Sequence, residues 1–460
     1  MNGSDPARDG LRALFDRLAQ VVSGSARDGE FVAAEFEAEA SEFARFNHAR
    51  VRQAGRVERA TVRLRLVHGA RQSFATFTLP GLGAGIDAVS AALDAALDAA
   101  RAALHDSAPD PLLDVNRAAS SGVDHVDGTA FERDAFVDAV GAAAGDADLV
   151  GFAAAGPLAR GWCSSAGACL WYQRSSVVFD YSIHLPPDAA ADGARKAVKA
   201  SWTGAALDAA GLQRSILESR TQAQLMTRAV RTLAPGTHRA LLAPRALADM
   251  IEMLSWGGFS ARAHLSGQSP LARLQRGEAA FASQVGLAED LGAGFAPSFQ
   301  SDGYRRPARV PLVEAGRFAG WLVSPRTARE FSIEGNAAAD GEAPESLRVA
   351  PGTLPDDQAL QRLGTGLWIG NFWYLNFAER QACRLTGMTR FATFWVERGE
   401  VVGPVEAMRF DDSLYGVLGE GLESLTARVE RFPSTDTYAS RSTGGIESPG
   451  ALLGGLRFAL

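Results

Sequence analysis

The most constraining feature of the sequence is the aromatic-rich stretch Leu363–Glu406, which carries three of the eight tryptophans and one of the three cysteines. Within it, residues 391–396 are almost all aromatic or β-branched, which is the composition of a buried strand. Arg398-Gly399 interrupts this run and Glu400-Val401-Val402 resumes it, so the sequence predicts two strands joined by a two-residue hairpin turn. A stretch of this kind requires a sheet and a hydrophobic core around it.

Arg380, Arg384 and Arg390 lie among these aromatic residues. An arginine that is buried without an acceptor costs free energy, so each guanidinium must have a partner. Two interpretations stay open. The arginines either pair internally, with Glu379, Glu397 or backbone carbonyls, or they line a cleft and contact a ligand.

The chain has 460 residues, more than one ordinary hydrophobic core accommodates, so two domains are expected. A long helical pattern, Ala205–Leu233, ends at Pro235-Gly236, and after it strands become shorter and glycines more frequent. We therefore expect an N-terminal domain at residues 1–235 and a C-terminal domain at residues 236–460.

The N-terminal domain is predicted to be an α/β sandwich-like unit with an antiparallel sheet and long helices. Thr61–His68 alternates apolar and charged residues, as a strand with one buried face does, and Gln72–Leu79 is its expected partner. Thr129–Glu132 is predicted to be a capping box that opens a helix ending near Ala144. The remaining expected elements are helices at Leu11–Val22 and Ile86–Leu104 and strands at Leu149–Ala155, Ala168–Gln173 and Val177–Leu185.

The C-terminal domain is predicted to be mostly antiparallel β, which places the whole chain in the α+β class. A strand at Arg239–Ala243 is followed by a helix at Arg245–Leu254. Glu314-Ala315-Gly316 is expected to be a hairpin turn, and Ser332–Leu354 an exposed loop. A final strand is expected within residues 448–460.

The bulk properties exclude several classes of partner. The formal net charge is −7 and no basic run occurs, so nucleic acid is not an expected partner. No apolar run reaches the roughly 18–20 residues that a membrane helix needs, so no membrane association is expected. Cys163, Cys169 and Cys383 are few and unpatterned, which predicts a reducing, cytoplasmic location.

Three segments resemble the TldD/TldE (PmbA) family of zinc-metallopeptidase-related proteins. Residues 366–405, GLWIGNFWYLNF…CRLTGMTRFATFWVERGEVVGPV, have the family's Gly-Leu-aromatic strand, its Thr-Gly step and its acidic-X-Gly turn. Residues 41–71 resemble the N-terminal domain of the family, in which an Arg-Phe-Asn step leads into paired strands. Residues 294–323 resemble its segment with a proline-containing loop before a hairpin. The order of these segments is consistent along nearly the whole chain.

The resemblance also shows what this sequence lacks. Catalytic TldD-type subunits carry H-E-x-x-x-H on a helix and a C-terminal cysteine, and these residues hold zinc and activate water. Here the corresponding helix, Arg245–Leu254, has Asp249 and Glu252 but no histidine, and residues 434–443 have no cysteine. No two of the seven histidines lie within five residues of each other. We therefore predict no catalytic residue, metal ligand or cofactor in this chain, and zinc in a partner.

By this resemblance the chain is expected to be a non-catalytic, TldE/PmbA-like subunit that pairs with a zinc-bearing TldD-like subunit. The implied activity of the complex is the processing or degradation of unfolded or modified peptides. Two alternatives stay open: a diverged peptidase that is active alone, or a non-enzymatic peptide-binding protein. The residues expected near the peptide are Arg380, Arg384, Thr386, Thr389 and Arg390.

Overall fold

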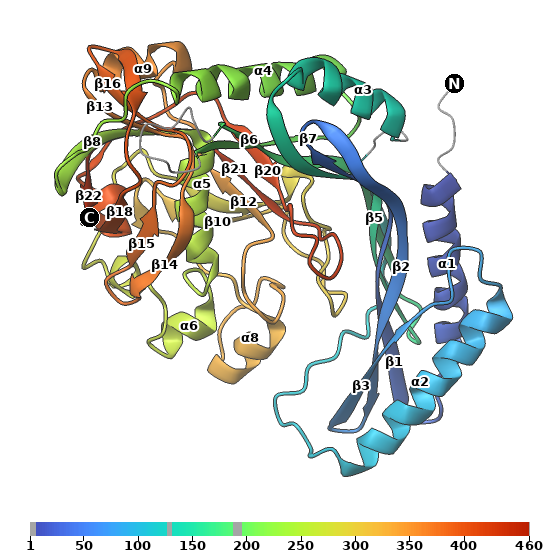
Figure 1. Ribbon diagram of the computed structural model, residues 1–460. Helices are drawn as coiled ribbons and strands as arrows, with labels where there is room; N and C mark the ends of the chain where they lie inside the picture. The colour runs from blue at the N-terminus through green and yellow to red at the C-terminus, as the bar shows by residue number, and fades with distance from the viewer. Residues whose placement is uncertain (1–5, 127–130, 187–195, 460) are drawn as a thin grey trace.

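The computed structural model describes residues 6–126, 131–186 and 196–459. One large sheet is built from the N-terminal part of the chain and two further sheets from the C-terminal part (Figure 1). Most strand pairs are antiparallel, which confirms the predicted α+β class. We retain the domain boundary between residues 235 and 236 as a proposal. No helix in the described residues is both long and apolar enough to cross a membrane.

The N-terminal sheet has seven strands in the order β3-β2-β1-β5-β6-β4, with β7 also paired to β6. Only the β4–β6 pair is parallel among the pairings described for this sheet. Its strands are β1 (Glu30–Asn47), β2 (Arg50–His68), β3 (Arg71–Thr78), β4 (Ser121–Val126), β5 (Asp148–Ser164), β6 (Cys169–His184) and β7 (Ala197–Gly204).

The two faces of this sheet differ because side chains alternate along each strand. On the outer face, apolar residues such as Val32, Ala34 and Phe36 of β1 pack against helices. The intervening residues of the same strand, Glu35 and Glu37, belong to the inner face, which is turned toward the C-terminal part of the chain. The helices that cover the outer face are α1 (Pro6–Ser23), α2 (Ile86–Asp106), α3 (Arg133–Ala144) and α4 (Ala209–Leu225).

The C-terminal part contains two sheets. The six-stranded sheet has the order β11-β10-β9-β12-β21-β20, and the nine-stranded sheet has the order β14-β15-β18-β22-β8-β13-β16-β17 with β19 paired to β22. The first comprises β9 (Leu287–Asp290), β10 (Arg309–Glu314), β11 (Arg317–Phe318), β12 (Ser346–Val349), β20 (Glu430–Pro433) and β21 (Gly445–Ser448). The second comprises β8 (Gly236–Leu242), β13 (Gly366–Ile369), β14 (Trp373–Glu379), β15 (Arg384–Met388), β16 (Thr393–Glu397), β17 (Glu400–Pro404), β18 (Arg409–Ser413), β19 (Leu422–Leu425) and β22 (Ala451–Phe458).

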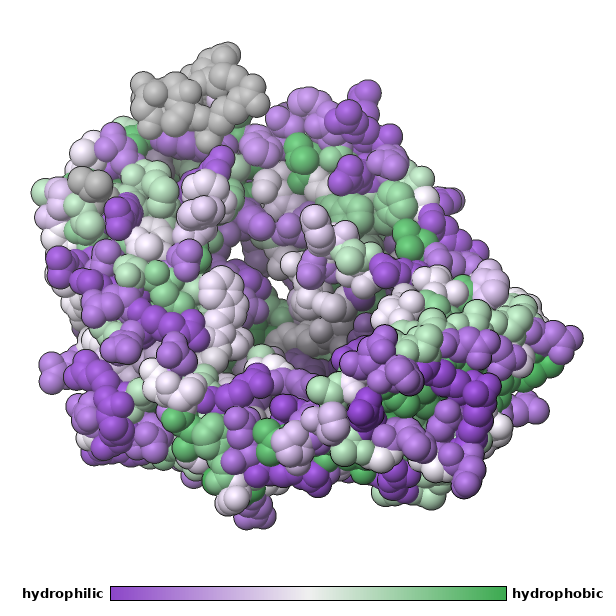
Figure 2. All heavy atoms as spheres, turned by 90° about the horizontal axis from the view of Figure 1, so that it is seen from below, coloured by the Kyte–Doolittle hydropathy of each residue, from purple (hydrophilic) through white to green (hydrophobic). Residues whose placement is uncertain are grey.

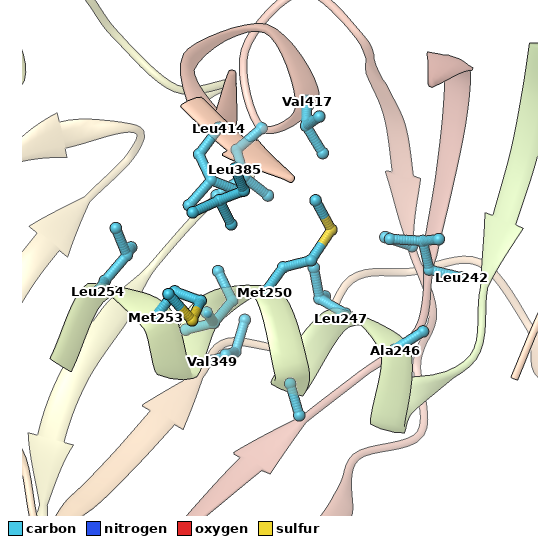
Figure 3. Close-up of a cluster of buried hydrophobic side chains, with 14 of the residues drawn as sticks. Leu242, Ala246, Leu247, Met250, Met253, Leu254, Val349, Leu385, Leu414 and Val417 are labelled. Carbon is cyan, nitrogen blue, oxygen red and sulfur yellow. The ribbon is translucent and has the colours of Figure 1, made fainter. Parts of the chain in front are cut away.

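Helix α5 (Pro244–Glu252) lies inside the C-terminal core, between residues of both sheets. Figure 3 shows Met250 directed toward Leu385 and Val417 on one side of the helix, with Val349 on the other. The shorter helices of this part are α6 (Ala261–Leu265), α7 (Ala272–Gln275), α8 (Pro325–Phe331), α9 (Ala359–Leu363), α10 (Leu414–Val417) and the 3-10 turns Met253–Ser255, Leu291–Ala293 and Asp356–Gln358.

The predicted hairpins are present. Strands β16 and β17 are joined by Arg398-Gly399, and both of these residues have positive φ, as a tight two-residue hairpin turn requires. Strands β10 and β11 meet at the predicted turn, and β22 is the predicted final strand. The helix predicted after the capping box is α3, but Thr129 lies outside the described residues and Glu132 makes no side-chain capping bond.

Three of the predicted elements are corrected. Residues 168–173 and 177–185 were expected to be two strands, but they form the single strand β6, in which buried polar residues such as Arg174 interrupt the apolar pattern. The helix predicted at 205–233 is limited to α4. Residues 332–354 are not an exposed loop, because Glu342 is fully buried and β12 lies within the segment. Glu342 accepts hydrogen bonds from Ser260 and Ser324.

Candidate functional site

Helix α5 presents its polar side to the space between the two parts of the chain. The helix starts with Pro244 at its first turn, which suits the fixed φ of proline. Its apolar side is buried in the C-terminal core, whereas Arg245, Asp249 and Glu252 form an ion-pair cluster. Arg245 lies 2.7 Å from Asp249 and 3.0 Å from Glu252, and its guanidinium stands over the ring of Phe432 at 5.2 Å.

Burial shifts the pKa values of the groups in this cluster. It raises the pKa of Asp249 and the pKa of Glu252, while Arg245 acts in the opposite direction on both carboxyl groups. The two carboxylates in turn raise the pKa of Arg245, although burial opposes them. Asp249 also accepts a hydrogen bond from the backbone N–H of Phe372, at 3.0 Å. Both carboxylates of α5 therefore share one guanidinium as their cationic partner.

Two adjoining cavities lie beside this cluster. One, of about 370 Å³, is bounded by α4, β7 and the start of α5, and includes Arg245, Glu430 and Phe432 in its wall. The other, of about 520 Å³, covers the end of the inner face that the C-terminal part leaves uncovered. We name that end the open half; it includes Arg45, Gln53, Phe152, Asp180 and Lys199.

Lys199 connects the two cavities, because it lines both of them. Its Nζ lies 3.5 Å from Asp180 Oδ2, and about two fifths of each side chain is exposed. Figure 2 shows the molecule from below, with a hollow near its middle between the two lobes. A solvent-accessible space lined by charged, aromatic and aliphatic groups can hold an extended peptide with mixed side chains.

A third cavity, of about 310 Å³, lies where residues 440–443 approach β1 and β5. Arg441 closes one side of it by donating hydrogen bonds to Ser41 Oγ, at 3.1 Å, and to the carbonyl oxygen of Gly156, at 3.3 Å. Burial lowers the pKa of Arg441 to about 10, partly offset by Glu39. The segment in which the family resemblance places a cysteine thus carries an arginine that fastens it to the N-terminal sheet.

The residues predicted to contact peptide lie elsewhere, on and around β14 and β15. Arg384 pairs with Glu379 at 2.8 Å and lies 3.6 Å from Asp411, so the internal partner considered from the sequence is present. Arg380 donates a hydrogen bond to the carbonyl oxygen of Gln268, at 2.9 Å. None of the five predicted residues lines the three cavities described above.

The other three predicted residues are also held by local contacts. Arg390 is exposed and stands over the ring of Trp373, at 4.3 Å from its centroid. Thr386 receives a hydrogen bond from Arg409, and buried Thr389 pairs with the backbone of Met408. The structure therefore places Arg384 and Thr386 on one strand, and their contact with a peptide stays a prediction.

Sequence reasoning missed the residues that do line the cavities. The signal for the α5 cluster was available, since Arg245 and Asp249 are four positions apart and therefore on one helix face. The sequence also offered a signal for Lys199, because the chain has only two lysines, Lys196 and Lys199. Arg441 carried no such signal, because its partners are more than 260 positions away.

The zinc ligand set of the catalytic family members does not fit these residues. Zinc needs about three protein ligands, and in the described residues no group of three or more His, Cys, Asp or Glu side chains is arranged to hold a metal ion. The helix expected to carry the ligands instead holds the Arg245 cluster, whose guanidinium would repel a cation. His264, the first histidine after α5 along the chain, donates a hydrogen bond from Nε2 to the carbonyl oxygen of Gly258, at 2.8 Å.

Comparison with known structures identifies the same fold in three proteins. These are a candidate modulator of a DNA gyrase from Thermotoga maritima (15% identity, TM-score 0.73, 98% of this chain and 100% of that one), TldE from Thermococcus kodakarensis (14%, 0.72, 98% and 100%) and a candidate modulator of DNA gyrase from Bacteroides thetaiotaomicron (12%, 0.70, 99% and 99%). No curated protein sequence matches significantly.

The family comparison gives a more specific result. Residues 235–460 match the model described as the PmbA/TldA metallopeptidase C-terminal domain. This is the region that holds α5, β14, β15 and the final strand, and the resemblance noted from the sequence is confirmed there. The chain is a member of the TldD/TldE (PmbA) family of metallopeptidase-related proteins.

Proposed function

We propose that this chain is the non-catalytic, TldE/PmbA-like subunit of a TldD/TldE-type zinc metallopeptidase complex that processes or degrades unfolded or modified peptides. The observation that carries the proposal is the Arg245 cluster. Two carboxylates on the helix that should hold the metal are bound to a guanidinium at 2.7 and 3.0 Å. A cation would have to displace Arg245 and then find a third ligand.

The cavities support the peptide part of the proposal. The space beside Lys199 combines charged, aromatic and aliphatic groups, and it lies between the two parts of the chain. A subunit with such a space and no zinc site of its own can shape the cleft of a complex and orient an unfolded chain. The three cysteines are free thiols, which is consistent with the cytoplasmic location that we propose.

The first test is the metal content of the isolated chain after gentle purification, measured by elemental analysis. We expect far less than one zinc ion per chain, and one tightly held zinc ion would overturn the non-catalytic assignment. The matched control is the Arg245→Leu variant. This substitution removes the guanidinium without adding a ligand, so the variant should also remain zinc-free, because Asp249 and Glu252 alone do not supply the three protein ligands that zinc needs.

The second test is peptide hydrolysis. The isolated chain is expected to leave an unfolded peptide intact, and the same peptide should be cleaved when a TldD-like subunit is added. Replacing the zinc-binding histidines of the added subunit should abolish cleavage. Hydrolysis by this chain alone, inhibited by a chelator, would contradict the proposal.

A further inference from the structure

One edge of the N-terminal sheet is left open over about half of the length of β2. Strand β3 pairs with Thr61–His68 only, whereas β1 pairs with β2 along nearly its whole length. Because β2 is next to last in the strand order, residues 50–59 form a free sheet edge within the described chain. Figure 1 shows β2 continuing past β3 toward α3.

The orientation of the backbone groups on this edge follows from one hydrogen bond. The N–H of Leu79 donates to the carbonyl oxygen of Ala60, at 2.9 Å, so Ala60 directs its backbone groups away from β1. Backbone direction alternates along a strand. Ala54, Arg56 and Glu58 therefore direct their N–H and C=O groups away from β1 as well, and no other described strand pairs with them there.

The charged side chains of this edge are mostly positive. Four arginines stand against one glutamate between residues 50 and 59, in a chain whose net charge is −7. Arg56 is 58% exposed although it lies 3.1 Å from Glu58. Val57 is also 39% exposed. The four arginines are Arg50, Arg52, Arg56 and Arg59.

An exposed aromatic residue stands at one end of the same edge. Arg59 donates a hydrogen bond to the carbonyl oxygen of Ala439, at 2.8 Å, which holds the tip of the segment 434–443 beside β2. The next residue back along this segment, Tyr438, is 99% exposed. The edge therefore offers backbone hydrogen bonds, positive charge and an aromatic ring within one short stretch.

We propose that residues 50–59 of β2 bind an extended acidic peptide, which adds to the sheet as a further strand. The backbone groups of Ala54, Arg56 and Glu58 supply sequence-independent hydrogen bonds, and the arginines select acidic side chains. A folded partner fits less well, because this segment is exposed on both faces and rich in arginine, whereas interface cores are depleted in charge. The proposal rests on the proposed function, since it names a substrate class for a peptide-handling subunit.

The test uses the isolated chain and a fluorescein-labelled ten-residue peptide of glutamate, threonine and valine. Fluorescence anisotropy at low salt should give at least tenfold tighter binding than a counterpart with lysine in place of glutamate, and added salt should weaken the binding. Amide hydrogen exchange should slow within residues 50–59 when the acidic peptide binds. Equal binding of both peptides, or protection confined to residues around Lys199, would overturn the proposal.

Two matched pairs of variants locate the site. Ala54→Pro removes one outward N–H that the β1–β2 ladder does not use, and it should weaken binding about tenfold. Ala54→Val keeps that N–H and should bind within about twofold of the parent chain. If Ala54→Pro does not fold, Arg56→Glu decides. Its control is Arg362→Glu at an exposed position of α9, which changes the net charge equally.

Arg56→Glu should weaken binding of the acidic peptide about tenfold, and Arg362→Glu should leave it unchanged. Equal effects of the two substitutions would show that only the net charge matters and would overturn the proposal. Peptide binding is measured on the isolated chain, so a negative result would reject the β2 site without rejecting the proposed function. That function is tested separately, by the zinc content of the isolated chain and by peptide cleavage with and without a TldD-like subunit.

Discussion

The two halves of the inner face of the N-terminal sheet use charged residues in different ways. In the half that the C-terminal part covers, which we name the sealed half, Arg160 lies 2.8 Å from Glu345 and 3.6 Å from Glu35, and its side chain is only 14% exposed. In the open half, Lys199 and Asp180 are 3.5 Å apart and each is about two fifths exposed. Similar charges thus hold the structure together in one half and remain accessible in the other.

The difference follows from solvent access. A charge removed from water must be compensated by partners, so each group of the sealed half has several, whereas water solvates the groups of the open half. Burial raises the pKa of Glu35, while Arg160 and Arg306 hold the pKa of Glu345 below its usual value despite burial. Substitutions in the sealed half should therefore change stability, and those in the open half should change binding.

The largest expected effect is that of Arg160→Ala. It leaves Glu35 and Glu345 without their shared cation, and removing one partner from a buried ion pair costs roughly 3–5 kcal/mol. Since the pair retains some exposure, we expect the free energy of unfolding to fall by about 3 kcal/mol in urea titrations. A loss below about 1 kcal/mol would mean that the sealed half is no more dependent on its charges than the open half.

The second prediction concerns pH. Burial raises the pKa of Glu35 to about 7, above its value in the unfolded chain, so the folded state binds this proton more tightly. Protonated Glu35 makes its full contribution to the free energy of unfolding below about pH 4.3, and this contribution is lost as the pH rises through 7.

Glu35→Gln should remove this dependence. Between pH 4.5 and 7.5 the parent chain should lose up to about 3 kcal/mol relative to the variant, as measured by parallel urea titrations. Glu37→Gln is the matched control, because Glu37 lies on the same strand face but is 61% exposed. The same pH profile in the parent chain and in Glu35→Gln would show that Glu35 titrates normally.

These charges also show how far the sequence predicts the fold. Alternation identified Thr61–His68, where one face is buried, but residues 50–59 are exposed on both faces and give no period, so the full length of β2 was not predicted. Strand β6 was divided in two because Gln173, Arg174 and neighbouring serines are buried by contacts with remote segments. Apolar patterns predict what a helix will cover, but they do not predict polar groups buried by a distant part of the chain.

The candidate site shows the same limit. Asp249 and Glu252 were visible on the predicted helix, yet the position of Asp249 and Arg245 near Lys199 depends on how two parts of the chain pack. Glu379 was considered as a partner of Arg384 because it lies five positions away. Local pairs can be predicted from the sequence, whereas a cavity between segments far apart in the chain cannot.

The third prediction concerns Lys199 in the open half. Lys199→Ala should lower the free energy of unfolding by less than about 1 kcal/mol, because its ion pair with Asp180 is exposed to solvent. Peptide cleavage by the complex with a TldD-like subunit should nevertheless fall several-fold, since Lys199 lines both cavities. Steady-state kinetics and thermal melting, measured on the same preparation, separate the two effects. A large loss of stability with unchanged cleavage would assign Lys199 to the structural group.

The smallest expected effect on stability is that of Arg384→Ala and Arg390→Ala. Arg384 is 42% exposed in its pair with Glu379, and Arg390 is exposed over Trp373, so each substitution should cost under about 1 kcal/mol. Both residues lie outside the described cavities, so a role in peptide handling requires that the partner extends the cleft to β14 and β15. In that case each variant should slow peptide cleavage by the complex while its melting temperature stays within a few degrees of the parent value. If cleavage is unchanged for both, the arginines serve only their local contacts, and the open half beside Lys199 is the better place to look for the peptide.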